Sequence, residues 1–90
     1  MGMLTADDVA RGDRVRVNLE GNDRSATVMG EVSSVSRPDH RIYVNVDESD
    51  DLLAEEVELG FGDDGVPAGA MVWNSSGSDA GWTVTGFELE

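Results

Sequence analysis

The chain has 90 residues, of which 39% are hydrophobic, so its length allows one small domain with a single core. It has no cysteine and one histidine, His40, which excludes disulfides, thiolate metal sites and the usual histidine-rich zinc clusters. Nineteen acidic residues oppose six arginines, no lysine is present, and the formal net charge is −13.

This acidity resembles that of proteins from salt-in halophiles, above all haloarchaea. Self-repulsion at such charge is severe at a Debye length of about 30 Å, near 0.01 M salt, and weak at about 3 Å, near 1 M. The acidity therefore says little about a partner. An acidic disordered tail is the alternative, and the ordered apolar alternation of the chain argues against it. Without a long apolar run or a cationic leader, we expect a soluble, cytoplasmic protein that does not enter a membrane.

The N-terminal segment predicts a short helical turn over residues 6–11. Thr5 suits the N-cap, Asp7 and Asp8 favour the first turn of a helix, and Gly12 stands where a C-terminal cap belongs. We expect Val9, with Leu4 before it, to plug one end of a sheet.

Residues 12–47 predict a three-stranded β-meander, with strands over residues 13–19, from near residue 25 to the turn at 37–40, and over 41–47. The inward positions of the first and third strands are Val15, Val17, Leu19, Ile42, Val44 and Val46. Gly21 and Asn22 can supply the positive φ values of the first hairpin, and Pro38 suits the second position of the next turn.

The second strand is expected to bend. Val28, Gly30 and Val32 share one parity, and Val35 is out of step with them. A β-bulge at Ser33 and Ser34 would restore the inward set. Glycine at position 30, in mid-strand, predicts a sharp bend or a close approach of another backbone.

The second half of the chain is less regular. Residues 48–51 suit a loop or a helix start, and both helix and strand remain open for residues 52–56, Leu52 to Glu56. Val57, Leu59 and Phe61 predict a fourth strand with an acidic outer face. Residues 62–65 predict a turn, followed by Pro67 at a strand start or an edge.

A short fifth strand is predicted over residues 70–73, and residues 74–81 read as a flexible hairpin loop. The last strand contains Trp82 and Val84 on one parity and Phe87 and Leu89 on the other. A second bulge at Gly86 would let this strand cross between the two halves of the sheet.

Together these elements predict an all-β fold, a small antiparallel and partly open β-barrel of five to six strands with a short N-terminal helical turn, formed by residues 1–90 as one domain. In residues 9–17 a Gly-Asp pair leads into the first strand, and in residues 28–32 a Gly-Glu-Val segment turns the second. This first half resembles small barrels of the Src-homology-3-like class. The resemblance implies a binding module more often than an enzyme. A β-sandwich and an oligonucleotide-fold barrel remain alternatives.

All six arginines lie in the first 46 residues, whereas residues 47–90 hold 12 acids and no base. Strand alternation places a candidate binding face on neighbouring strands of the meander, made of Arg14, Arg16, Met29, Arg41 and Tyr43. Such a face can bind single-stranded nucleic acid, since guanidiniums contact phosphates and a ring stacks on a base. We favour the alternative that these arginines pair with nearby acids and keep the face soluble, the acids being Asp13, Glu20, Glu31 or Asp39.

The large aromatic residues are expected mainly in the core, as Trp73, Trp82, Phe61 and Phe87. As an alternative, Trp73 and Trp82 would flank the loop between them and form an aromatic groove for a protein or a peptide.

Neither a metal site nor a catalytic centre is indicated. Residues 45–56 follow the ligand spacing of a calcium loop loosely, but Asp50 stands where that loop needs glycine. His40 beside Asp39 could orient a general base, yet no nucleophile and no phosphate loop accompany it. We therefore expect no cofactor and no catalysis. The sequence favours an interaction module for a protein partner or its own copy, with a nucleic-acid-binding barrel as the alternative.

Overall fold

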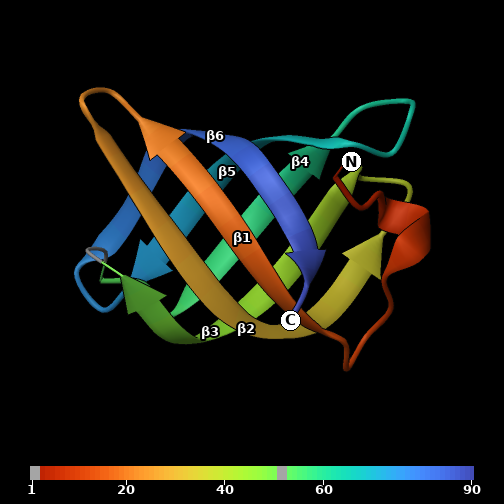
Figure 1. The fold of residues 1–90 in the computed structure, drawn as a ribbon, viewed down its shortest axis with the longest axis horizontal. Helices are drawn as coiled ribbons and strands as arrows, with labels where there is room; N and C mark the ends of the chain where they lie inside the picture. The colour runs from red at the N-terminus through yellow and green to blue at the C-terminus, as the bar shows by residue number, and fades with distance from the viewer. Residues whose placement is uncertain (1–2, 51–52) are drawn as a thin grey trace.

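The computed structural model describes residues 3–50 and 53–90. Each strand pairs in antiparallel fashion with the next along the chain, and β6 also pairs with β1, so the sheet closes into a barrel (Figure 1). The elements are the 3-10 turn η1 (Ala6–Asp8) and the strands β1 (Arg14–Gly21), β2 (Arg24–Ser36), β3 (Arg41–Asp50), β4 (Glu56–Phe61), β5 (Pro67–Asn74) and β6 (Gly77–Leu89). Within the described residues, no helix is long and apolar enough to cross a membrane.

The expected small antiparallel barrel is confirmed, and it is closed where a partly open barrel was expected. Closure results from the ladder between β1 and β6, which runs along β1 from Val15 to Glu20. A closed sheet leaves no continuous unpaired edge for another chain to extend.

The barrel interior is filled by side chains from all six strands and from the N-terminal segment. Strand alternation explains this, because successive residues point to opposite faces of a sheet. The buried hydrophobic residues are Ala6, Val9, Val15, Val17, Leu19, Ala26, Val28, Val32, Ile42, Val44, Val57, Leu59, Val72, Trp82, Val84 and Phe87. No polar or charged residue among those described is buried, so the core is held by apolar burial, about 1.5–3 kcal/mol for each large side chain.

Among the described residues, the ladders of the barrel contain five irregularities, at each of which the pairing of two strands shifts. Ser33 is an extra residue of β2, because Val32 pairs with Val44 and Ser34 with Tyr43. This confirms the bulge expected at Ser33 and Ser34.

The ladder between β1 and β6 contains the second bulge that was expected. Asn18 pairs with Gly86 and Leu19 with Val84, so Thr85 is the extra residue.

Three further shifts were not foreseen. One lies on β3, where Asp47 is skipped between the partners of Met29 and Gly30. The other two lie between Gly60 and Phe61 in the ladder with β5, and between Ala70 and Val72 in the ladder with β6. Each shift changes parity by one residue, so valines before and after it can both face the core.

Gly30 lies where β2 and β3 approach most closely. A Cβ atom at this position would lie 1.9 Å from the carbonyl oxygen of Asn45 and 2.9 Å from the Cα of Val46. Both atoms belong to the backbone, which cannot rotate away. The close approach expected for this glycine is therefore confirmed.

The N-terminal segment plugs one end of the barrel, as expected. Val9 is buried, and Leu4 packs against the core as a half-buried residue. The Thr5 side chain accepts a hydrogen bond from the backbone of Asp7 at 3.3 Å, which confirms its role as N-cap. The helical turn is shorter than expected, since it ends at Asp8 and Val9 is already extended.

Gly12 is not the cap of that turn, so this expectation was wrong. It lies just before β1 with a φ of +98°, and its N–H donates to the carbonyl of Val32 at 2.8 Å. Its conformational freedom serves the entry into the first strand.

The first hairpin is tighter than the sequence indicated, and the next turn is as expected. Gly21 pairs with Arg24, so the first hairpin turns at Asn22 and Asp23, and Asp23 has the positive φ of 60° that was expected at Gly21 or Asn22. The turn over residues 37–40 is confirmed, since the His40 N–H donates to the Arg37 carbonyl at 3.2 Å.

The expectation of a long flexible loop over residues 74–81 was wrong. Asn74 pairs with Gly77, and the hairpin between β5 and β6 turns at residues 75 and 76 alone. The Oδ1 atom of Asn74 accepts a hydrogen bond from the Ser76 N–H at 2.8 Å and closes this turn. Small polar residues therefore continue a strand here, because the cross-strand ladder satisfies their backbone.

Strand β3 continues to Asp50, so the loop or helix start expected from residue 48 was wrong for residues 48–50. Of the segment 52–56, Leu52 lies outside the described residues, as does Asp51. Residues 53–55 are neither helix nor strand, and β4 begins at Glu56, which confirms the predicted fourth strand. Strand β5 starts at Pro67, as expected, and is longer than the predicted segment 70–73.

Replacing Gly30 by alanine is expected to destabilise the protein by at least about 3 kcal/mol, the upper end of the usual cost of overpacking. The cause is the backbone contact with Asn45, which only movement of a strand could relieve. Urea denaturation in molar KCl measures the loss. Gly69→Ala is the matched control, because a Cβ there meets only the carbonyl oxygen of Trp82 at 3.8 Å. Equal unfolding midpoints for the two variants would contradict this account of Gly30.

Candidate interaction face

Strands β3, β4 and β5 align their outward residues in three cross-strand rows. The outward positions alternate with buried ones, which include Ile42, Val57 and Val72. The first row is Arg41, Gly60 and Gly69, the second is Tyr43, Glu58 and Met71, and the third is Asn45, Glu56 and Trp73. We call these nine residues the Gly60–Gly69 face. The strand pairing alone brings together residues from three separate parts of the chain.

A hollow of about 220 Å³ lies on this face. Gly60 and Gly69 pair with each other in the ladder and carry no side chain, so they leave the strand backbone bare at this point. The remaining lining residues are Arg41, Glu58, Ala70, Met71 and Ala80. Sites for drug-sized molecules measure about 300–1,000 Å³, so this hollow suits one inserted side chain better than a small-molecule ligand.

Arg41 lies beside the hollow and has no carboxylate partner among the described residues. Its Nη1 atom donates to the carbonyl oxygens of His40 and Asp39, at 2.9 and 3.2 Å. The same atom lies 3.3 Å from the position that a Cβ of Gly60 would take. The guanidinium therefore reaches from β3 toward β4, and the glycine leaves room for it.

Tyr43 and Glu58 interact at the centre of the face. Glu58 is the cross-strand neighbour of Tyr43, and hydrogen bonding to its carboxylate is the main cause that raises the pKa of Tyr43 above 10.0. Partial burial and the charge of Glu58 act in the same direction. Tyr43 therefore remains a neutral donor at all physiological pH values.

Trp73 gives the face an exposed aromatic side chain, since 42% of its surface is accessible. It faces outward because its neighbour Val72 faces the core. Tyr43 and Met71 are half-buried. The face therefore combines an indole, a thioether, a phenol and one guanidinium.

The predicted face of five residues is not brought together by the structure. Arg14, Arg16 and Met29 lie on β1 and β2, whereas Arg41 and Tyr43 lie on β3 in the rows described above. On β2 the partner of Arg16 is Met29, whereas the partners of Tyr43 and Arg41 are Ser34 and Ser36, so the two groups are separated along the strands. The sequence could not show this separation, because it depends on the register between the strands.

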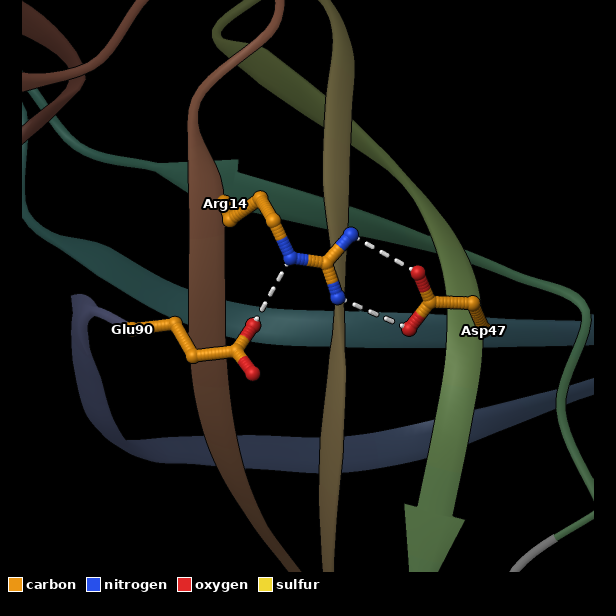
Figure 2. A network of polar contacts seen from close by, with 3 residues as sticks. All are labelled: Arg14, Asp47 and Glu90. Atoms are coloured by element: carbon orange, nitrogen blue, oxygen red, sulfur yellow. Dashed lines mark hydrogen bonds and ion pairs between the residues drawn. The ribbon is translucent and has the colours of Figure 1, made fainter.

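Arg14 is held by two carboxylates, that of Asp47 on β3 and that of Glu90, which follows β6. Its Nη1 and Nη2 atoms donate to both oxygens of Asp47 at 2.8 and 3.0 Å, and its Nε donates to Glu90 at 3.1 Å (Figure 2). These bonds raise the pKa of Arg14 and lower the pKa of Asp47, first through hydrogen bonding. Figure 2 shows the guanidinium between the ribbons of β1 and β3, over β2.

Arg16 lies 3.8 Å from Glu88, and half-buried Met29 is its cross-strand neighbour. Arg14 and Arg16 thus pair with acids, although with other acids than the four that were expected. Both pairs are solvent-exposed, and such pairs contribute little to stability because water and salt screen them.

Trp73 and Trp82 do not line a common groove. Trp82 is only 3% exposed and belongs to the core, as does Phe87, while Phe61 is half-buried against it. The Arg24 guanidinium covers the Trp82 ring at 4.0 Å from its centroid and pairs with Asp79. Trp73 was expected mainly in the core and is exposed instead.

No group of three or more possible metal ligands is gathered among the described residues. The segment expected to follow a calcium-loop spacing is extended strand up to Asp50. His40 stacks on Phe61, with ring centroids 5.2 Å apart. The sequence did not single out Gly60, Gly69, Met71 or Glu58, although two outward glycines in strands were a visible signal.

Comparison with protein-family models, curated proteins and solved structures finds no match to this chain.

The raised pKa of Tyr43 is directly measurable, because Tyr43 is the only tyrosine. Titration by absorbance at 295 nm should give a pKa above 10.0 for the native protein. Glu58→Gln removes the charged acceptor and should lower this pKa toward 10.0, while Glu31→Gln, on β2, should leave it unchanged. Because the folded pKa is the higher one, the stability from this pair is complete below pH 10 and is lost as the pH rises through the folded value. An unshifted pKa in the native protein would contradict the hydrogen bond.

Proposed function

We propose that this protein is a salt-adapted, non-catalytic interaction module that binds a protein, either a partner or its own copy, through the Gly60–Gly69 face. The observation that carries the proposal is that three features meet on one face: a hollow of the size of a side chain, the exposed Trp73, and the Arg41 guanidinium, which has no carboxylate partner among the residues that the structure describes. Tryptophan, tyrosine, methionine and arginine are enriched in protein interfaces, where a few such residues supply most of the binding energy.

The packed interior also supports binding at the outer surface. The inward residues of all six strands fill the barrel, and the larger ones include Trp82, Phe87, Leu19, Ile42 and Leu59. Small barrels that hold a ligand do so in an interior that side chains leave open. A partner must therefore be recognised by outward residues.

Nucleic-acid binding, the alternative reading, receives less support from the geometry. Arg14 and Arg16 engage carboxylates, and Arg41 lies on a face with Glu56 and Glu58. A strand of phosphates needs several free cations along one groove, because phosphate contacts supply most of the affinity.

The proposal includes adaptation to molar salt in the cytoplasm of a salt-in organism. A barrel of 90 residues with a net charge of −13 repels itself least in molar salt, where the Debye length is only about 3 Å. Asp23, Glu31 and Asp63 have no ion pair within the part of the chain that the structure describes, so no nearby cation offsets the repulsion on these carboxylates.

The salt adaptation is tested by the free energy of unfolding between 0.1 and 2 M KCl. It should rise with salt, and the triple variant Asp23→Asn, Glu31→Gln and Asp63→Asn should show a smaller rise, because fewer charges remain to be screened. The matched control exchanges the same three residues between aspartate and glutamate and should behave as the native protein. A native protein that is equally stable at both salt concentrations would contradict the adaptation.

The interaction face is tested with a photoreactive amino acid at Met71, cross-linked in the native cell. Adducts with protein should form from position 71 and should be lost when Gly69→Leu fills the hollow. Arg16 is the control position, because β1 lies three strands from β4, the middle strand of the face, and therefore on the opposite side of the six-stranded barrel. Equal adducts from positions 71 and 16, or adducts insensitive to Gly69→Leu, would refute the proposed face.

A further inference from the structure

We propose that the hollow of the Gly60–Gly69 face is occupied by Trp73 of a second copy of this chain, so that two barrels associate face to face about a two-fold axis. This inference rests on the proposed function and names the partner.

The face carries both a projecting side chain and a recess for one. Trp73 projects from β5, and Gly69 contributes to the recess on the same strand. They are four residues apart, which corresponds to about 13 Å along a strand. The same separation of four residues relates Glu56 to Gly60 on β4 and Asn45 to Arg41 on β3.

The register therefore makes the face self-complementary. In a two-fold interface, residue i of one copy contacts residue j of the other, and j contacts i. An axis along the middle row exchanges the first row with the third, because both are two residues from it on every strand. This operation places Trp73 of each copy over Gly69 of the other.

The same operation matches opposite charges. It places Glu56 of one copy over Gly60 of the other. The Arg41 guanidinium lies beside that glycine, with its Nη1 atom 3.3 Å from the position that a Cβ of Gly60 would take. Arg41 has no carboxylate partner within its own chain among the described residues. Two such pairs, one at each end of the interface, would supply the missing partner of Arg41.

The middle row sets the condition for association. It brings Met71 against its own copy and also Glu58 against Glu58, and each chain carries a net charge of −13. Like charges oppose the dimer at low ionic strength and are screened in molar salt. We therefore expect association in 2 M KCl and dissociation in 0.1 M KCl.

The size of the face determines the strength of the dimer. Three strands about 5 Å apart and rows spanning about 13 Å form a patch far smaller than the roughly 800 Å² per partner of a standard interface. Such small interfaces belong to weak, reversible complexes. We expect a dissociation constant on the order of 10⁻⁵ to 10⁻³ M.

Sedimentation in 2 M KCl from 10 µM to 1 mM protein tests the dimer. The average mass should rise from 9.6 kDa toward twice that value, and acrylamide quenching of Trp73 should fall in parallel, since Trp82 is buried in either state. Trp73→Ala removes the projecting ring, and Gly69→Leu fills the recess, where a Cβ meets only one atom at 3.8 Å. Each should weaken association at least about tenfold. Leu89→Ala removes another exposed apolar side chain, 55% accessible, and should associate as the native chain does.

Two mixed experiments separate this contact from unspecific association. Trp73→Ala has an intact recess and Gly69→Leu an intact ring, so a mixture of the two should restore one of the two contacts and reduce the quenching of the remaining Trp73. Arg41→Glu and Glu56→Arg should each weaken the dimer, and the double variant should restore it to within about threefold, with circular dichroism as the check on folding.

A native protein that remains at 9.6 kDa at 1 mM in 2 M KCl would overturn the inference. So would a dimer that Gly69→Leu and Trp73→Ala leave intact. If the chain is monomeric while cross-linking from position 71 to another protein still depends on Gly69, this inference fails and the proposed function remains. If that cross-linking is also lost, both fail.

Discussion

The packing of Gly30 against the backbone of Asn45 and Val46 is the contact on which the barrel depends. Around this point β2 changes its partners: it pairs with β1 from Arg24 to Glu31 and with β3 from Thr27 to Ser36. The bulges at Ser33 and at Asp47 lie on either side of it along the ladder. Because strands can approach closely here and shift by one residue, one curved sheet keeps its valines inward and returns β6 to β1.

Closure and register then decide what the surface presents. Arg14 and Arg16 face one side of the barrel and meet carboxylates, whereas Arg41 faces another side with Tyr43, Met71 and Trp73. The two outward glycines create a recess on the face that β3, β4 and β5 form. The interaction face is thus a consequence of pairing between β3, β4 and β5 and requires no segment beyond the sheet.

Much of the fold was readable from local patterns, because alternation and turn residues act over a few positions. They predicted the meander, the bulges at Ser33 and Gly86 and the close approach at Gly30. The limits of β3, β5 and β6 were missed, since polar residues such as those of 77–81 extend only when a neighbouring strand pairs with them. Of the Gly60–Gly69 face, the sequence indicated Arg41, Tyr43 and Trp73 as binding residues, but in separate groups. Their assembly on one face depends on the long-range register between strands, which a single sequence does not contain.

The central claim is the register between β4 and β5, because a slip of one residue would turn Met71 and Trp73 toward the core. Nuclear Overhauser contacts between backbone protons, measured in molar KCl, test it most directly. The account requires contacts that pair Glu58 with Met71 and Gly60 with Gly69. Contacts that pair Glu58 with Ala70 or with Val72 instead would contradict the register and, with it, the Gly60–Gly69 face.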